Sequence, residues 1–161
     1  MDGFEKMVVY GVSFDVVNKQ PIVLLKGEAS NRYLPIWIGN TEAAAILARL
    51  QNAEPPRPMT HDLMTNILGR LEAHLDSILV TELKENTFYA VLNLTAEGHR
   101  IDVDSRPSDA IALAVRVDAP IFAKEELLEA NAIEFEQEED PEVIVKEFRD
   151  FLDEVSPEDF V

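Results

Sequence analysis

The N-terminal part of the chain contains three strand-like segments joined by links of only a few residues. Residues 6–17 alternate apolar with polar or small side chains, and 22–27 and 33–39 are short apolar runs. The links between them, 18–21 and 28–32, are shorter than the dozen or more residues that a parallel return needs. We therefore expect an antiparallel sheet. The alternation predicts that one side of the first strand carries Val8, Tyr10, Val12, Phe14 and Val16.

Helical periodicity follows this first sheet. Gly39-Asn40-Thr41 offers a cap for a helix in which Glu42 lies in the first turn. The three prolines of residues 54–58 predict a stiff, non-helical linker. A second helix is expected to begin at Thr60, its predicted cap. The apolar stripe of the first helix is Ala43, Ile46, Leu47 and Leu50, and that of the second is Leu63, Met64, Ile67, Leu68, Leu71 and Leu75.

Strand patterns return at about 77–84, 87–95 and 99–104. A third helix is expected to open at Arg106-Pro107, where proline suits the first turn, and to be deeply buried because it has almost no polar face. A short strand over Pro120 to Ala123 and one or two helical turns over 124–131 complete residues 1–133. This order of elements predicts a single α+β domain, a mostly antiparallel sheet with helices packed on it.

Residues 134–161 form an acidic C-terminal extension. Of the 31 acidic residues in the 161-residue chain, 15 lie in residues 124–161, together with only three of the 14 basic residues. Asp140-Pro141 is a good helix start, and a helix over residues 141–155 has one apolar stripe. Such a short helix needs a partner surface, on its own domain, on a second subunit or on another protein. The stripe consists of Ile144, Phe148, Phe151, Leu152 and Val155.

Composition excludes several classes of protein. The chain has no cysteine, which excludes disulfide scaffolds, thiolate catalysis and cysteine-ligated metal sites. No apolar run approaches the roughly 20 residues that span a bilayer, and the first ten residues lack the plan of a signal peptide. We therefore expect a cytoplasmic protein. The formal net charge of −17 repels polyanions at long range, so nucleic-acid chemistry would need a divalent metal or a locally basic groove.

Three segments concentrate the residues that can carry chemistry: LPIWIGNTEAAAI (34–46), RPMTHDL (57–63) and DVDSRPSDAIALAVR (102–116). Helix starts with nearby arginine bind anions, and carboxylate oxygens are the ligands that Mg²⁺ prefers. His61 is a candidate general acid or base. Taken singly, the same side chains also suit helix caps and salt bridges. The carboxylates that could form a metal site are Glu42, Asp62, Asp102, Asp104 and Asp109.

On these three segments and the later Ala-Pro-Ile, the chain resembles the bifunctional nuclease domain family over roughly residues 6–125. The extension lies outside the resemblance and looks like an addition found in actinobacterial relatives. The resemblance implies a compact α+β fold that is commonly dimeric, and some members are described as degrading both RNA and DNA. The positions that match the family pattern are Glu42, Arg57, Thr60, His61, Asp62, Ser105, Arg106, Pro107, Ser108, Asp109 and Arg116.

Three functions remain open at this point. In a metal-assisted nuclease, Asp62, Asp109 and Glu42 would hold Mg²⁺ or Mn²⁺ and His61 would move a proton, with no organic cofactor. The residues expected to bind its phosphate substrate are Arg57, Arg106, Ser105 and Ser108.

The alternative is a non-enzymatic homodimer that binds a small anion and whose acidic helix docks a protein partner. A third reading has the acidic extension imitating nucleic acid in the basic site of a partner. A nuclease predicts that three carboxylates converge in one cleft with His61, whereas the binding module predicts that each is paired with arginine.

Overall fold

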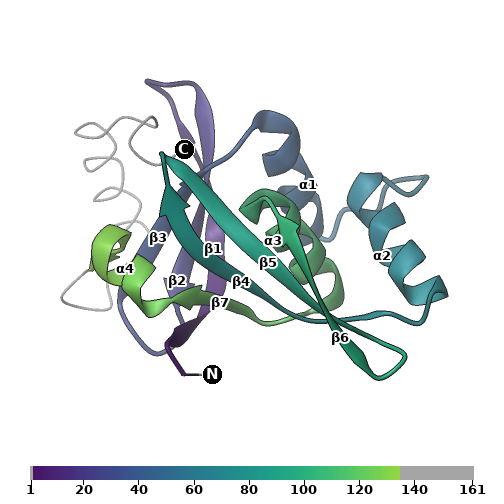
Figure 1. The fold of residues 1–161 in the computed structure, drawn as a ribbon. Helices are drawn as coiled ribbons and strands as arrows, with labels where there is room; N and C mark the ends of the chain where they lie inside the picture. Colours follow the sequence, from purple (N-terminus) through teal and green to yellow (C-terminus); the bar gives the residue numbers. More distant parts are fainter. Residues whose placement is uncertain (1, 135–161) are drawn as a thin grey trace.

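The computed structural model describes residues 2–134, in which one mixed sheet carries the helices (Figure 1). Within these residues the sheet has eight strands in the order β6-β5-β4-β7-β1-β2-β3-β8. This arrangement confirms the predicted α+β fold with a mostly antiparallel sheet. The strands are β1 (Phe4–Asp15), β2 (Gln20–Gly27), β3 (Arg32–Trp37), β4 (His74–Lys84), β5 (Thr87–Ala96), β6 (His99–Ser105), β7 (Ile121–Lys124) and β8 (Ile133–Glu134).

The first three strands are antiparallel, as their short links predict. The predicted alternation along β1 was wrong, because the register with β2 shifts between Val9 and Gly11. The shift places Tyr10 in a β-bulge and changes which face the later residues of β1 occupy. Met7 is buried, and Val9 and Val12 pack against the core, whereas the side chain of Phe14 is half exposed.

One pair of described strands, β4 and β7, is parallel. β7 also pairs with β1 in the antiparallel sense, so it joins β1–β3 to β4–β6 in a single sheet. This insertion places the segment that follows the third helix in the middle of the sheet. Residues distant in the sequence therefore become neighbours on the face that carries the helices.

Three helices, α1 (Asn40–Leu50), α2 (Thr60–Arg70) and α3 (Pro107–Val117), pack together, with α3 in contact with both others. The fourth, α4 (Glu125–Asn131), lies apart from them in Figure 1 and contacts β3, β4 and β7. The central part of α3 is buried from Ala110 to Ala114, which confirms the burial predicted from its missing polar face. The core lies between α3, α1 and the strands beneath them.

The second helix differs from its prediction. The face that packs on the rest of the chain is formed by His61, with Thr65 and Leu68 half-buried, and most of the apolar stripe is exposed. Ile67, for example, has 48% of its surface exposed. The exposed apolar residues of α2 are Leu63, Met64 and Ile67, with Met59 and Leu71 at its two ends.

The caps of α2 and α3, for which the sequence offered the hydroxyl residues Thr60 and Ser105, each differ by one residue. Met59, not Thr60, is the N-cap of α2, because the Asp62 carboxylate accepts a hydrogen bond from the Met59 backbone N–H. Arg106, not Ser105, is the N-cap of α3, and Pro107 occupies the first helical position as predicted. The cap positions therefore carry a methionine and an arginine where hydroxyl side chains were expected.

The extension predicted for residues 134–161, with its helix over 141–155, lies outside the described residues from position 135 onward. Its separation from residues 1–133 stays a prediction. Among the described helices none combines the length and the apolar character that crossing a membrane requires.

Candidate functional site

A cleft of about 630 Å³ lies between the length of α1, the start of α2 and α3. Its ionic residues come from all three helices and its apolar residues from α1 and from the linker before α2. It unites residues from all three chemistry-bearing segments. The side chains that line it are Thr41, Glu42, Ala44, Ala45, Ala48, Arg49, Ala53, Glu54, Pro55, Met59, Thr60, His61, Asp62, Arg106, Asp109 and Arg116.

His61 and Asp109 form a hydrogen-bonded pair in this cleft. His61 lies in the first turn of α2 and is only 8% exposed, and its Nε2 is 2.9 Å from Oδ1 of Asp109 in the first turn of α3. A carboxylate only accepts hydrogen bonds, so Nε2 carries the hydrogen. In the neutral ring this leaves the lone pair on Nδ1. His61 can therefore accept a proton through Nδ1 while Asp109 holds the ring in place.

Asp109 remains ionised because two donors outweigh its burial. Burial raises the pKa of Asp109, but the hydrogen bonds from Arg106 and His61 lower it by more than burial raises it. The pKa of Asp109 therefore lies below its ordinary value. Arg106 donates from Nε to Oδ2 at 2.9 Å and from Nη2 to Oδ1 at 3.2 Å. The same contacts raise the pKa of Arg106, chiefly through its hydrogen bond to Asp109.

Glu42 reaches the same arginine from α1. Nη1 of Arg106 donates to Oε1 of Glu42 at 3.1 Å. The Glu42 carboxylate folds back over Gly39, the N-cap of its own helix, where a Cβ atom would collide with it. The missing side chain of Gly39 thus leaves room for the Glu42 carboxylate in the position where it accepts the hydrogen bond from Arg106.

Asp62 has a different partner, Arg116 in the last turn of α3. Nε of Arg116 donates to Oδ1 of Asp62 at 2.8 Å, and Nη1 donates to the Ala112 carbonyl oxygen at 2.8 Å. The Arg116 side chain is only 7% exposed. The hydrogen bond from Arg116, followed by that from the Met59 N–H, lowers the pKa of Asp62. This ion pair links the first turn of α2 to the last turn of α3, and both of its residues line the cleft.

Other predicted residues lie outside the cleft. Arg57 is exposed in the linker and does not line it. Ser108 is buried and lines a neighbouring cavity of about 220 Å³ with Trp37, which Glu42 and Arg106 also border. The Ser105 hydroxyl donates to the Arg106 carbonyl oxygen.

The two remaining carboxylates of the predicted set are on β6. Asp102 pairs there with Arg100, and neither Asp102 nor Asp104 lines the cleft. The apolar lining from α1 and the linker was not foreseen, although Thr41, Ala45 and Ala48 recur at helical spacing on one side of α1.

The cleft carboxylates do not form a metal site as they are arranged. Both oxygens of Asp62 and both of Asp109 accept hydrogen bonds from nitrogen donors. Within residues 2–134 no group of three His, Cys, Asp or Glu side chains is placed to hold a metal ion. A metal ion here would have to displace Arg106 or Arg116. The geometry meets both earlier criteria, since three carboxylates share a cleft with His61 and each is also paired with arginine.

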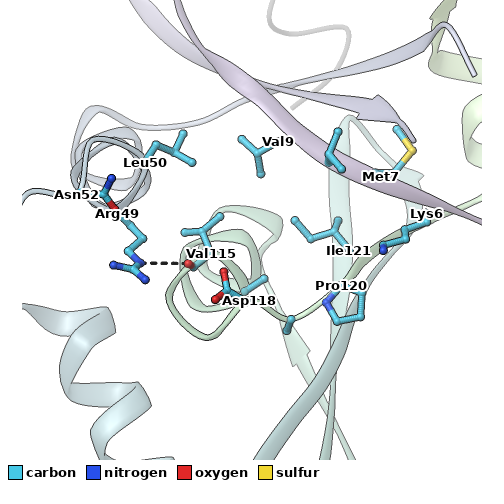
Figure 2. A pocket seen from close by; sticks show the side chains of 13 residues that line it. Lys6, Met7, Val9, Arg49, Leu50, Asn52, Val115, Asp118, Pro120 and Ile121 are labelled. Atoms are coloured by element: carbon cyan, nitrogen blue, oxygen red, sulfur yellow. Dashed lines mark hydrogen bonds between the residues drawn. The ribbon is translucent and has the colours of Figure 1, made fainter. Parts of the chain in front are cut away.

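A second hollow, of about 600 Å³, lies between β1 and the C-terminal ends of α1 and α3 (Figure 2). Its lining is largely apolar, with Val9, Val115 and Ile121 among the labelled side chains. Arg49 lines both hollows and donates from Nε to the Val115 carbonyl oxygen. No histidine lines the second hollow, so the pair of His61 and Asp109 is a feature of the first.

Comparison with known proteins adds a family to this geometry. A family model described as the bifunctional nuclease domain matches residues 23–136. The chain is 41% identical over 159 residues to an uncharacterized protein of Mycobacterium tuberculosis, covering 94% of this chain and 95% of that protein. It is 29% identical over 119 residues to bifunctional nuclease 1 of Oryza sativa, covering 72% of this chain and 36% of the rice protein. With bifunctional nuclease 2 of Arabidopsis thaliana it shares 28% identity over 103 residues, 31% of the plant protein's length.

Proposed function

The chain belongs to the bifunctional nuclease domain family, and from this premise we propose that it hydrolyses phosphodiester bonds of nucleic acid in the cleft between α1, α2 and α3. The observation that carries the proposal is the His61–Asp109 pair, with Arg106 bonded to the same carboxylate. A buried histidine oriented by a carboxylate is a general base, and an arginine beside it offers charge to a phosphate. Plant relatives named nucleases share this domain, over about a third of their length.

The proposed reaction uses only side chains of the cleft. A water molecule attacks the phosphorus atom while Nδ1 of His61 accepts one of its protons. The bond from phosphorus to the leaving sugar oxygen breaks, and the imidazolium returns the proton to that oxygen. Arg106, whose side chain is 64% exposed, faces solvent beside this pair and compensates the growing charge on the phosphate oxygens. Asp109 stabilises the imidazolium without taking its proton, because its pKa is lowered.

A metal ion has no part in this reaction, because its expected ligands Asp62, Asp109 and Glu42 already pair with arginine. We therefore expect cleavage to persist in EDTA. Loss of cleavage in EDTA, restored by Mg²⁺ or Mn²⁺, would show that the carboxylates leave their arginine partners and bind metal, as the sequence first predicted.

The arginine pairing also favours a second candidate function, the non-enzymatic module. In that case Arg106 and Arg116 are structural partners of Glu42, Asp62 and Asp109, and the exposed edge of Arg106 binds a small anion without turnover. The two functions differ in whether His61 is needed for cleavage.

The test is cleavage of end-labelled single-stranded RNA and DNA by highly purified protein. The variant His61→Ala/Asp109→Ala removes the proposed base and its partner. The chain offers a matched control in His74→Ala/Asp76→Ala, an exposed histidine–aspartate pair outside the cleft whose Nε2 and Oδ1 are 3.7 Å apart. All three proteins are purified identically.

We expect the cleft variant to lose at least a hundredfold in kcat, as removal of a general base does, and the control to keep wild-type activity. Equal cleavage by wild type and the cleft variant would refute the proposed site. No cleavage by any of the three proteins would favour the binding module.

A further inference from the structure

The cleft has an apolar wall that phosphodiester chemistry does not require. Beside its ionic residues it is lined by Ala44, Ala45 and Ala48 of α1, and by Ala53, Pro55 and Met59 of the linker and the N-cap of α2. Ala48 is six residues along α1 from Glu42, about 9 Å at 1.5 Å per residue. The wall thus extends along α1 from the contact between Glu42 and Arg106, within the same cleft.

The volume of the cleft points to an organic group on this wall. About 630 Å³ lies in the middle of the range of roughly 300–1,000 Å³ for sites that bind small organic molecules. A phosphate diester held at Arg106 would fill only part of it. An attached group that is flat and largely apolar on its faces would cover the alanines, and Met59 could pack against such a ring through its polarizable sulfur.

The charges of the cleft make that apolar contact necessary for binding. Three arginines line it against four carboxylates, so its formal charge is not positive. Nucleic-acid binding usually draws its affinity from several cations that neutralise phosphates. Arg106 and Arg116 are already paired with carboxylates, and Arg49 donates to the Val115 carbonyl oxygen. Contact with the wall therefore has to supply the binding energy that free cations would otherwise provide. The cationic side chains are Arg49, Arg106 and Arg116, and the anionic ones are Glu42, Glu54, Asp62 and Asp109.

Resting on the proposed function, we infer that the apolar wall binds one unpaired nucleobase next to the scissile phosphate, so that the substrate class is single-stranded nucleic acid. A base inside a duplex is stacked and paired, and bringing it to the wall costs a few kcal/mol of unpairing. The alanines, Pro55 and Met59 present no side-chain hydrogen-bond donor to the edge of a base. Recognition there depends on the face of the base and has little sequence preference.

Binding and cleavage test the inference separately. Fluorescence anisotropy measures Kd for a labelled single-stranded oligonucleotide, for the same strand in a duplex, and for a strand of abasic tetrahydrofuran units. We expect the duplex and the abasic strand to bind about tenfold more weakly than the single strand, the equivalent of about 1.4 kcal/mol. In the Ala48→Leu variant the wall is filled, and we expect Kd for the single strand to rise to that of the abasic strand.

The matched control is Ala130→Leu, the same change on the exposed side of α4 outside the cleft, which should leave every Kd unchanged. Equal Kd values for base-bearing and abasic strands, or for single strand and duplex, would overturn the inference. So would single-strand binding that Ala48→Leu does not weaken. Because Kd is also measured in His61→Ala/Asp109→Ala, these outcomes stand whether or not the protein cleaves, and absence of cleavage alone contradicts only the proposed function.

Discussion

At the scale of single residues, the charge arrangement of the cleft is set by which carboxylate pairs with which arginine. Arg106 forms ion pairs with both Glu42 and Asp109, whereas Arg116 forms an ion pair with Asp62. Position and residue type suggested these charged groups as candidates before the fold was known. The pair of Arg106 and Asp109 has local spacing, and the sequence offered it as a possible salt bridge. The contacts to Glu42 and Asp62 were not predictable, because an arginine side chain reaches carboxylates on neighbouring helices and local spacing shows only those on its own.

Gly39→Ala tests how Glu42 is placed. A Cβ atom at this position collides with the flexible Glu42 carboxylate, so we expect the fold to survive and the contact between Glu42 and Arg106 to be lost. Cleavage by Gly39→Ala should then match that of Glu42→Gln, and the double variant should lose no more than either. Additive losses would mean that Gly39 acts by another route. Gly69→Ala is the control, because its added Cβ meets nothing within 4 Å, and it should stabilise α2 by about 0.5–1 kcal/mol.

The pair of Asp62 and Arg116 predicts a pH dependence of stability. The pKa of Asp62 is lowered from 3.8 in the folded protein, so the unfolded chain binds its proton more readily. The stability that Asp62 contributes is therefore present above pH 3.8 and disappears as the pH falls through the lower, folded-state value. In urea unfolding, the difference in free energy between wild type and Asp62→Asn should be largest near pH 7 and shrink towards pH 3. A difference that is constant with pH would contradict this assignment.

At the scale of elements, α2 and α3 show two uses of apolar helical spacing. α3 is enclosed by α1, α2, β4 and β5, and Ile111 is fully buried. α2 packs on α3 through one narrow face, and its apolar stripe faces away from the domain. Periodicity identifies which side of a helix is apolar, but whether another element covers that side depends on the arrangement of the whole sheet.

A pair of isoleucine variants measures this contrast. Ile111→Ala should reduce the free energy of unfolding by about 2–5 kcal/mol, because it leaves a cavity in the core. Ile67→Ala, at a position 48% exposed, should cost less than about 1 kcal/mol. Urea denaturation gives both values. Equal losses would show that α2 is covered in solution, as the homodimer expected from the family resemblance would require.

At the scale of the whole molecule, the net charge of −17 opposes the approach of a polyanion to a cleft without excess cations. Most nucleic-acid enzymes lose affinity as salt is added. Here we expect kcat/KM on a single-stranded oligonucleotide to rise between about 10 and 150 mM NaCl, over which the screening length falls from about 30 to about 8 Å. A steep fall over the same range would instead indicate a basic surface that dominates binding.

The sequence by itself determined most local elements and the residue types that are available for chemistry. Short links made the first strands antiparallel, the missing polar face of α3 predicted its burial, and the absence of cysteine removed thiolate chemistry. These features depend on neighbours within a few residues, which a pattern reports directly. The bulge at Tyr10 and the caps at Met59 and Arg106 depend on hydrogen bonds that no pattern showed.

Only the tertiary structure decided which helix starts meet. β7 inserts between β4 and β1, and α3, which precedes it, packs against α1 and α2. That packing brings Asp109 to His61 and Arg106 to Glu42, over 48 and 64 positions of sequence. It leaves Asp102, Asp104 and Arg57 outside the cleft. It also adds an apolar wall that no sequence motif predicted. The physical reason is that contacts between distant residues depend on strand order, which local periodicity does not encode.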